Sequence, residues 1–194
     1  MSTSLHQIRA FIAVDVGPEV RAILRPVFEK LRKVSHKVRW VPEQNWHLTA
    51  KFLGDVDGQQ IGKIAEAMQE EAAQHTAFDL EFRGIKPFPP NREPRIIALD
   101  VESGTEALAA FHKGLDQRMR AFGVASEKRH FLAHLTLGRV KGTSNTPRFW
   151  DLIQRNAETD FGIAHISDAV LYQSHLRPEG AEYVPLAQAE FKRQ

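Results

Sequence analysis

Apolar and polar residues along this chain change from the alternating spacing of strands to the three-to-four-residue spacing of helices. Residues 8–16 are rich in apolar and β-branched side chains and predict a strand, which the Gly17-Pro18 pair ends. Apolar residues then recur every three or four positions from Glu19 to Val34, which predicts a helix. Pro18 suits the first turn of that helix, whereas Pro26 predicts a kink within it.

The same contrast predicts the other elements. Strands are expected over residues 37–41, 47–53, 78–85, 95–101, 131–140, 162–173 and 183–186. Helices are expected from 57 to 72, from 105 to 122 with Gly123 as the terminating glycine, and from 147 to 155, and a Pro-rich loop is expected over 86–94. No long linker or low-complexity segment interrupts this succession, so we predict one compact unit over residues 1–194.

Composition narrows the function classes. The chain has 194 residues, 42% of them hydrophobic and 26% charged, which indicates an ordinary globular protein of one domain or two small lobes. It has no cysteine, which excludes disulfides, thiolate zinc sites, cysteine nucleophiles and iron–sulfur clusters. Near its start only Phe11–Val14 is an unbroken apolar run, too short for an export signal or a membrane span, so we expect a cytoplasmic protein.

The sequence contains an internal repeat. Ile12–Val16 (IAVDV) matches Ile97–Val101 (IALDV), and in each copy a predicted helix and then a His-Leu-Thr tripeptide follow. The aspartate of the first copy precedes His47 by 32 residues, and that of the second precedes His134 by 34. One such tripeptide occurs easily by chance, but two at equivalent places indicate two related halves, over about 8–54 and 95–140.

Each His-Leu-Thr strand offers one imidazole and one hydroxyl to the same side. Residues two apart on a strand share a face, so His47 lies with Thr49, and His134 lies with Thr136. The same rule places their apolar neighbours on the opposite faces: Leu48, Ala50 and Phe52 in the first strand, Leu135 and Leu137 in the second. If a two-fold axis relates the halves, the two polar pairs meet across a cleft.

These four side chains suit the chemistry of phosphate esters. With a pKa near ~6.5, one imidazole can accept a proton from water while the other donates one to a leaving oxygen. Threonine hydroxyls can donate to the non-bridging oxygens. Arg139 is a natural partner for phosphate, but in a regular strand it points away from His134. A bulge at Gly138 is needed to bring it round.

Other interpretations of the nine histidines compete with this one. A single histidine or threonine on a half-buried strand is more often structural. His130 and His134 have the spacing of a helical zinc pair, but they lie in a predicted strand, so we predict no metal site. The remaining six are expected to be surface or capping residues: His6, His36, His75, His112, His165 and His175.

Charge is unevenly distributed although the net charge is only +2. Residues 113–141 carry seven basic and two acidic side chains, whereas residues 156–190 carry one basic and six acidic ones. A basic stretch around the second His-Leu-Thr favours an anionic ligand, although Arg118 and Arg120 also suit a solvated helix face. Phe88 and Trp46 are candidates for stacking on a nucleobase, and Trp46 suits the core equally well.

The segments that carry a family resemblance are Arg9–Ala13 (RAFIA), Trp40–Gly54 (WVPEQNWHLTAKFLG), Phe131–Arg139 (FLAHLTLGR), Leu171–Ser174 (LYQS), Gly180 and Tyr183. Together they resemble the two-histidine (2H) phosphoesterases, and within them the RNA 2′,3′-cyclic phosphodiesterases, historically called 2′-5′ RNA ligases. The resemblance covers nearly the whole chain, and the paired His-x-Thr motifs are specific when they occur together.

The resemblance implies an α+β fold of two pseudo-symmetric lobes, each an antiparallel sheet with helices outside, around a central cleft. It implies hydrolysis of an RNA 2′,3′-cyclic phosphate end to a 2′-phosphomonoester without a metal or cofactor, and in some members the joining of tRNA halves. His47 would be the proton donor, His134 the proton acceptor, and Thr49, Thr136 and Arg139 would bind the substrate. The chain departs from the family pattern at Ala50, where leucine is common, and at Ala133, where proline is common.

Two alternatives stay open at this point. A related enzyme could act on another cyclic or 2′-5′-linked nucleotide, and a protein without catalysis could bind RNA ends through the basic stretch. We expect a monomer that binds RNA and no membrane.

Overall fold

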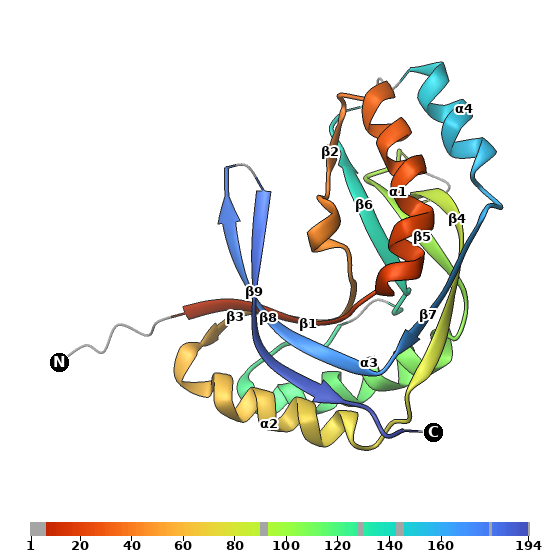
Figure 1. The fold of residues 1–194 in the computed structure, drawn as a ribbon. Helices are drawn as coiled ribbons and strands as arrows, with labels where there is room; N and C mark the ends of the chain where they lie inside the picture. Colours follow the sequence, from red (N-terminus) through yellow and green to blue (C-terminus); the bar gives the residue numbers. More distant parts are fainter. Residues whose placement is uncertain (1–6, 90–92, 128–129, 143–145, 179, 194) are drawn as a thin grey trace.

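The computed structural model describes residues 7–89, 93–127, 130–142, 146–178 and 180–193, which form two antiparallel sheets with helices on their outer sides (Figure 1). Sheet A has the strand order β3-β1-β8-β9, and sheet B has the order β2-β6-β5-β4-β7. The strands are β1 Gln7–Val14, β2 Val38–Trp40, β3 Leu48–Asp57, β4 Phe78–Phe88, β5 Ile96–Ser103, β6 His134–Val140, β7 Asp160–Ile166, β8 Asp168–Arg177 and β9 Gly180–Glu190. The helices are α1 Gly17–Val34, α2 Ile61–Ala72, α3 Thr105–Met119 and α4 Pro147–Arg155, with short 3-10 turns η1 Glu43–Asn45, η2 Gly58–Gln60 and η3 Arg120–Phe122.

The two lobes are built alike. In sheet A, β3 follows His47 and pairs with β1, which pairs on its other side with β8. In sheet B, β6 begins at His134 and pairs with β5, which pairs on its other side with β4. Each half of the chain also sends elements to the other lobe. Helix α1 leaves sheet A and packs on β7 of sheet B, whereas α3 leaves sheet B and packs on β3 of sheet A. The predicted class, α+β with two pseudo-symmetric lobes, is confirmed.

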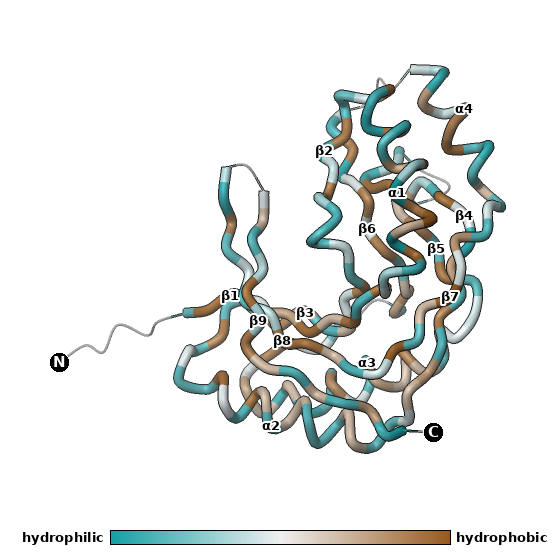
Figure 2. The backbone as a smooth tube through the Cα atoms, viewed as in Figure 1, coloured by the Kyte–Doolittle hydropathy of each residue, from teal (hydrophilic) through white to brown (hydrophobic). Residues whose placement is uncertain are grey.

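Helix α1 shows how the apolar pattern becomes packing. Its residues Val20, Leu24, Phe28 and Leu31 are buried and lie on one stripe, as the predicted spacing requires. The helix begins two residues earlier than predicted, keeps Pro18 in its first turn and continues through Pro26 as one helix. Figure 2 shows the same contrast in colour, with hydrophobic residues on the sides of the helices that face the sheets and hydrophilic ones outside.

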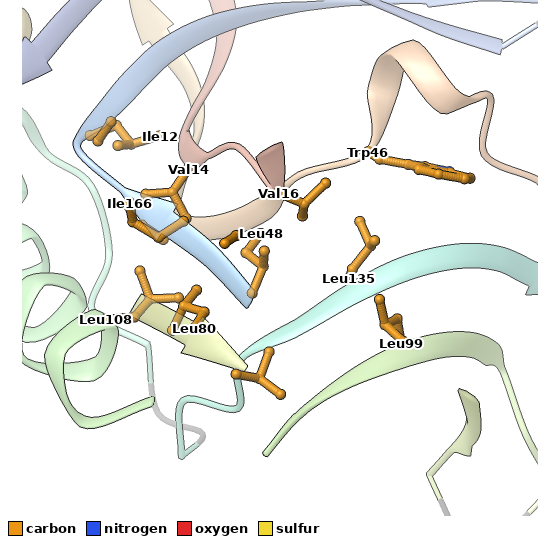
Figure 3. Packing of buried hydrophobic residues seen from close by; sticks show 14 of the residues in the cluster. Ile12, Val14, Val16, Trp46, Leu48, Leu80, Leu99, Leu108, Leu135 and Ile166 are labelled. Atoms are coloured by element: carbon orange, nitrogen blue, oxygen red, sulfur yellow. The ribbon is translucent and has the colours of Figure 1, made fainter. Parts of the chain in front are cut away.

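Both lobes share one continuous core. Leu48 and Leu135, the middle residues of the two His-Leu-Thr tripeptides, are almost completely buried and belong to the same cluster of side chains (Figure 3). Strands β3 and β6 are also in contact. The two His-Leu-Thr strands therefore come together from different lobes, anchored through their apolar faces. Within the described residues no helix is both long and apolar enough to cross a membrane.

Several element boundaries differ from the sequence prediction, among them those of β4, β6, β7 and β8. The predicted loop at 86–88 is the end of β4, because these residues pair with Ile96–Ala98 although one of them is Pro87. Strand β6 begins at His134 and not at 131. The run 162–173 is divided between β7 and β8, and β8 pairs with a longer β9 in a hairpin whose polar tip has no apolar pattern. Gly123 follows the third helix with φ +78°, as predicted for a terminating glycine.

Strand β6 contains a β-bulge at Leu137. From Thr136 to Gly138 the strand advances two residues while its partner β5 advances one. The alternation of side chains therefore reverses, and Arg139 lies on the same face as Thr136. This is the bulge that the sequence analysis required at Gly138 to bring Arg139 round.

Strand β3 has a bulge at the equivalent position, Ala50. From Thr49 to Lys51 it advances two residues while β1 advances one. The prediction that Phe52 points away from Thr49 is therefore wrong. Phe52 shares the face of Thr49, is 61% exposed, and its ring centroid lies 6.4 Å from that of Phe11.

Gly138 lets the bulged strand β6 approach β2 closely. A Cβ at this position would lie 2.4 Å from Val38 Cγ1 and 2.9 Å from Trp40 Cε3. Gly138→Ala should therefore lower the free energy of unfolding by about 1–3 kcal/mol, measured by denaturant titration. Gly62→Ala is the matched control because a Cβ on Gly62, in α2, meets nothing within 4 Å, and its stability should stay equal or rise slightly. Equal stability of the two variants would contradict this account of the bulge.

Candidate functional site

His47 lies between the 3-10 turn η1 and strand β3, and its ring is held at both nitrogens. Nδ1 lies 2.8 Å from the carbonyl oxygen of Asn45, and Nε2 lies 3.1 Å from Thr49 Oγ1. A carbonyl oxygen can only accept, so Nδ1 carries a proton and donates it. Nε2 is therefore the nitrogen of His47 that is available to exchange a proton with a ligand.

The surroundings of the His47 ring keep it uncharged. The ring stacks on Phe11 with centroids 4.9 Å apart and meets Tyr183 edge-on at 5.3 Å. This burial lowers the pKa of His47 to about 4, against the hydrogen bond to Asn45 and the charge of Asp15, which raise it. His47 is therefore neutral at neutral pH in the free protein. The charge of His134 lowers the pKa of His47 further, so the two histidines lie within electrostatic reach of each other.

The turn that carries His47 is held by helix α1. Arg21 donates hydrogen bonds to the carbonyl oxygens of Glu43 and Trp46 and pairs with Asp15. Asn45 is fixed from the other side, because its Nδ2 donates to a carbonyl oxygen of β9 at 2.6 Å. A helix packed on sheet B and a strand of sheet A thus set the position of one imidazole.

His134 begins strand β6 and repeats the arrangement of His47. Its Nδ1 lies 2.9 Å from the carbonyl oxygen of Leu132, again two residues earlier, so Nε2 is again the nitrogen left for a ligand. The ring of Phe88 lies parallel to the imidazole, with centroids 5.8 Å apart and 6° between the planes. Asp100 of β5 lies opposite His134 in the ladder and is bound by Lys86 at 2.6 Å.

The two aromatic residues proposed for base stacking have different surroundings. Phe88 lies against His134 at the end of β4, partly accessible. Trp46 is 1% exposed, packs on Phe28 and donates from Nε1 to the carbonyl oxygen of Val41. Of the two roles left open for Trp46, the structure supports the core residue, because at 1% exposure neither ring face is open to a base.

All five predicted site residues lie on the faces of the two sheets that carry the His-Leu-Thr pairs, which we call the inner faces. Thr49 follows His47 on sheet A, and Thr136 follows His134 on sheet B. Arg139 joins the inner face of sheet B through the bulge. Arg139 also interacts electrostatically with Tyr183 on β9 of sheet A. Burial raises the pKa of Tyr183, and the positive charges of Arg139 and Arg9 lower it. The arrangement combines two imidazoles, two hydroxyls and a guanidinium, groups that suit an anionic phosphate.

Lys51 is a residue of this region that sequence reasoning missed. It follows the bulge of β3, is 1% exposed, and its Nζ donates to Asp116 Oδ1 at 2.8 Å and to the carbonyl oxygen of Ala125 at 3.2 Å. Burial raises the pKa of Asp116, but the hydrogen bonds from Lys51 and from the backbone N–H of Glu127, together with the charge of Lys51, outweigh it and hold that pKa well below its usual range. Lys51 thereby fastens β3 to α3 and to the segment that leads to His134.

His112 corrects the expectation that the other histidines are surface or capping residues. It is 8% exposed, its Nδ1 donates to the carbonyl oxygen of Ala50 at 2.6 Å, and its ring stacks on Phe131 with centroids 4.4 Å apart. It thus joins the bulge of β3 to the approach to β6. His36 and His165 are exposed, whereas His75 and His175 are partly buried; His6 lies outside the described residues.

His130 is exposed and lies outside any strand. Among the residues that the structure describes, no three histidine, aspartate or glutamate side chains come together in a group that could hold a metal ion. Metal independence stays a prediction.

The sequence was compared with protein families and known proteins. It matches the family described as LigT like Phosphoesterase twice, over residues 14–98 and again over 99–183. The chain belongs to the LigT-like phosphoesterases. It is 32% identical over 185 residues to the RNA 2′,3′-cyclic phosphodiesterase of Thermotoga maritima, covering 95% of this chain and 96% of that protein. It is 32% identical over 179 residues to the enzyme of the same name from Archaeoglobus fulgidus, covering 92% and 98%.

Solved structures have the same fold as this chain. The crystal structure of TT0787 from Thermus thermophilus matches with a TM-score of 0.80 at 24% identity, over 96% of this chain and 100% of that one. The structure of E. coli LigT complexed with 3′-AMP matches with a TM-score of 0.72 at 20% identity, over 96% and 99%. At these identities the likeness establishes the two-lobed fold alone.

The depressed pKa of His47 has a measurable consequence. An NMR titration of the His47 ring should give a midpoint of about pH 4, and its resonance is assigned by its loss in His47→Gln. Inorganic phosphate in the site should raise the midpoint, because an adjacent negative charge favours the imidazolium. Since the folded pKa lies below the unfolded value of about 6.5, the contribution of His47 to stability is present above about pH 6.5 and is lost as the pH falls toward about 4. A midpoint near 6.5 without phosphate would contradict the burial described.

Proposed function

We propose that this LigT-like phosphoesterase hydrolyses the 2′,3′-cyclic phosphate at the end of an RNA to a 2′-phosphomonoester. The observation that carries the proposal is the approach of His47 and His134 from two lobes, each with Nδ1 bound to a carbonyl oxygen and Nε2 left for a ligand. Two relatives that are 32% identical to this chain support the substrate class. Both are named RNA 2′,3′-cyclic phosphodiesterase, and this chain matches them over nearly their whole length.

The reaction needs one proton acceptor and one proton donor. His134 takes a proton from water on Nε2 as the water oxygen bonds to phosphorus, and the bond between phosphorus and the 3′ oxygen breaks. His47 gives the proton on its Nε2 to that 3′ oxygen, which leaves as a hydroxyl. The product keeps the phosphate on the 2′ oxygen, and exchange with solvent returns both imidazoles to their starting states.

His47 is neutral in the free protein, and it can still act as the proton donor if binding of the substrate favours its protonated form. With a pKa of about 4, His47 carries little charge at neutral pH before binding. A cyclic phosphate is an anion, and beside the ring it raises the pKa of the imidazole and so favours the protonated form. Thr49, Thr136 and Arg139 hold the non-bridging oxygens, where negative charge grows in the transition state.

The same groups serve the joining of RNA halves. If the 5′ hydroxyl of a second RNA takes the place of water, its oxygen bonds to phosphorus, the 3′ oxygen leaves, and a 2′-5′ linkage forms. We include this ligation of tRNA halves in the proposal as a second outcome of one site.

The proposal is tested by the product. A short RNA with a 2′,3′-cyclic phosphate end, incubated with the protein in EDTA, should yield the 2′-phosphate at the rate seen without EDTA, identified by chromatography against both standards. A 3′-phosphate product would reverse the donor and acceptor roles, and inhibition by EDTA would contradict a metal-independent reaction. Binding of the RNA without hydrolysis would favour a non-catalytic RNA-binding protein.

The two histidine roles are tested with a substrate whose leaving atom needs no proton. His47→Ala and His134→Ala should each lower kcat on the natural cyclic phosphate by about 10²–10⁴-fold. When sulfur replaces the 3′ oxygen, the leaving thiolate is stable unprotonated, so His47→Ala should regain activity whereas His134→Ala should not.

The control for this pair is His165→Ala on β7, an exposed histidine paired with Asp79, which should behave as wild type on both substrates. Recovery of the His134 variant in place of the His47 variant would exchange the two roles. Recovery of neither would show that His47 acts in another way than by protonating the leaving atom.

A further inference from the structure

Four basic side chains form two rungs at one end of sheet B, next to the candidate site. Arg139 of β6 lies opposite Arg39 of β2 in the ladder. The pairing continues one step beyond the bounds of both strands, because the backbone N–H of Lys141 donates to the carbonyl oxygen of Lys37 at 2.6 Å. We call Lys37, Arg39, Arg139 and Lys141 the basic ladder.

The basic ladder lies on the inner face of sheet B. The bulge puts Arg139 on that face, and directly paired residues share a face, so Arg39 lies there too. Lys37 lies two residues before Arg39, and Lys141 lies two residues after Arg139. Because residues two apart on a strand share a face, both lysines also lie on the inner face. All four side chains are exposed, whereas Val38, between Lys37 and Arg39, is 6% exposed. The ladder therefore continues the line of His134 and Thr136 outward along β6.

The charges of the basic ladder have no acidic partner in the part of the chain that the structure describes. No ion pair or side-chain hydrogen bond joins any of the four to a carboxylate there. By contrast, Arg21, Arg25, Lys86 and Arg118 each bind a carboxylate. Like charges directly opposite on neighbouring strands repel each other and are destabilising. Binding of an external polyanion would relieve the repulsion among the four basic side chains, so this surface suits such a ligand.

The chemistry of the surface favours a sugar–phosphate backbone. None of the large apolar side chains that are exposed in the described residues lies on β2, on β6 or beside the ladder. Successive side chains on one face of a strand are about 6.6 Å apart, so the two rungs present charge at two successive positions. A chain with repeated phosphates can meet both rungs, whereas a single phosphate can meet only one.

We propose that the basic ladder binds the phosphates of the nucleotides that precede the cyclic end of a single-stranded RNA. The inference rests on the proposed function, since the ladder begins at Arg139, which holds the terminal phosphate. It goes further in naming the substrate class: an RNA strand of several nucleotides is preferred over a cyclic mononucleotide. Lys37, Arg39 and Lys141 contact only the nucleotides that precede the cyclic end, which a mononucleotide lacks, and they take no part in proton transfer.

The test compares two substrates and two variants that remove equal charge. The substrates are cytidine 2′,3′-cyclic phosphate and a tetranucleotide with the same end. The ladder variant is Lys37→Ala/Lys141→Ala. The control is Lys63→Ala/Lys113→Ala, which removes two exposed lysines from α2 and α3, the helices on the outer side of sheet A.

Wild type should have a higher kcat/KM for the tetranucleotide than for the mononucleotide. The ladder variant should lose that preference while its kcat/KM for the mononucleotide stays unchanged, and the control should retain the preference. Binding supplies a second measurement. For a fluorescent tetranucleotide with a 2′-phosphate end, the slope of log affinity against log salt should become shallower by about 1.4 in the ladder variant, since each single-strand phosphate contact contributes about 0.7.

The outcomes separate this inference from the proposed function. Hydrolysis of both substrates with equal kcat/KM by wild type would overturn the inference and leave the proposed function standing. An equal loss in the control would show a general effect of charge and would also overturn it. Hydrolysis of neither substrate would contradict the proposed function, and the inference with it. A tetranucleotide preference that disappears only in the ladder variant supports both.

Discussion

The pairing of each His-Leu-Thr strand with its neighbour, and the extra residue that each strand carries three positions after its histidine, determine where the side chains of the site point. A bulge at Ala50 and another at Leu137 occupy equivalent positions in the two halves. Before each bulge a histidine and a threonine share the inner face. After it the alternation reverses, which brings Arg139 to that face in one lobe and an exposed Phe52 in the other. The same reversal turns Lys51 into the interior.

The bulge of β3 is held in place by residues from the other half of the chain. His112, from the helix that follows β5, donates to the carbonyl oxygen of Ala50 and stacks on Phe131. Lys51 binds Asp116 of the same helix. Because the leucines of both tripeptides are also buried in one core, neither imidazole can shift without disturbing the other lobe. This rigidity suits a reaction in which two groups act on one phosphorus atom.

Sequence patterns predicted the parts of the fold and site that repeat. The matching IAVDV and IALDV segments and the two His-Leu-Thr tripeptides identified the strands, and strand alternation gave the face that His47 shares with Thr49. Phe52 and His112 were predicted wrongly, Lys51 was missed, and Trp46 was left between two roles, of which the core role is the correct one. Phe52 and Lys51 depend on a bulge that leaves no trace in the apolar pattern, because Ala50 suits a regular strand equally well. His112 and Trp46 depend on partners far away in the sequence. The basic ladder could not be predicted either, because it depends on how residues 37–39 pair with residues 139–141.

The exchange of elements between the lobes bears on how such a chain could arise. Each half of the sequence sends a helix and a long strand, α1 and β4 or α3 and β8, to the sheet begun by the other half. Neither half can complete a sheet or cover it alone. A polypeptide of half this length could complete and cover its sheet by exchanging the same elements with a second copy. In such a dimer the two equivalent histidines, one from each copy, would face each other across a two-fold axis. Joining two such genes end to end would free the copies to diverge, leaving an arginine after one bulge and a phenylalanine after the other.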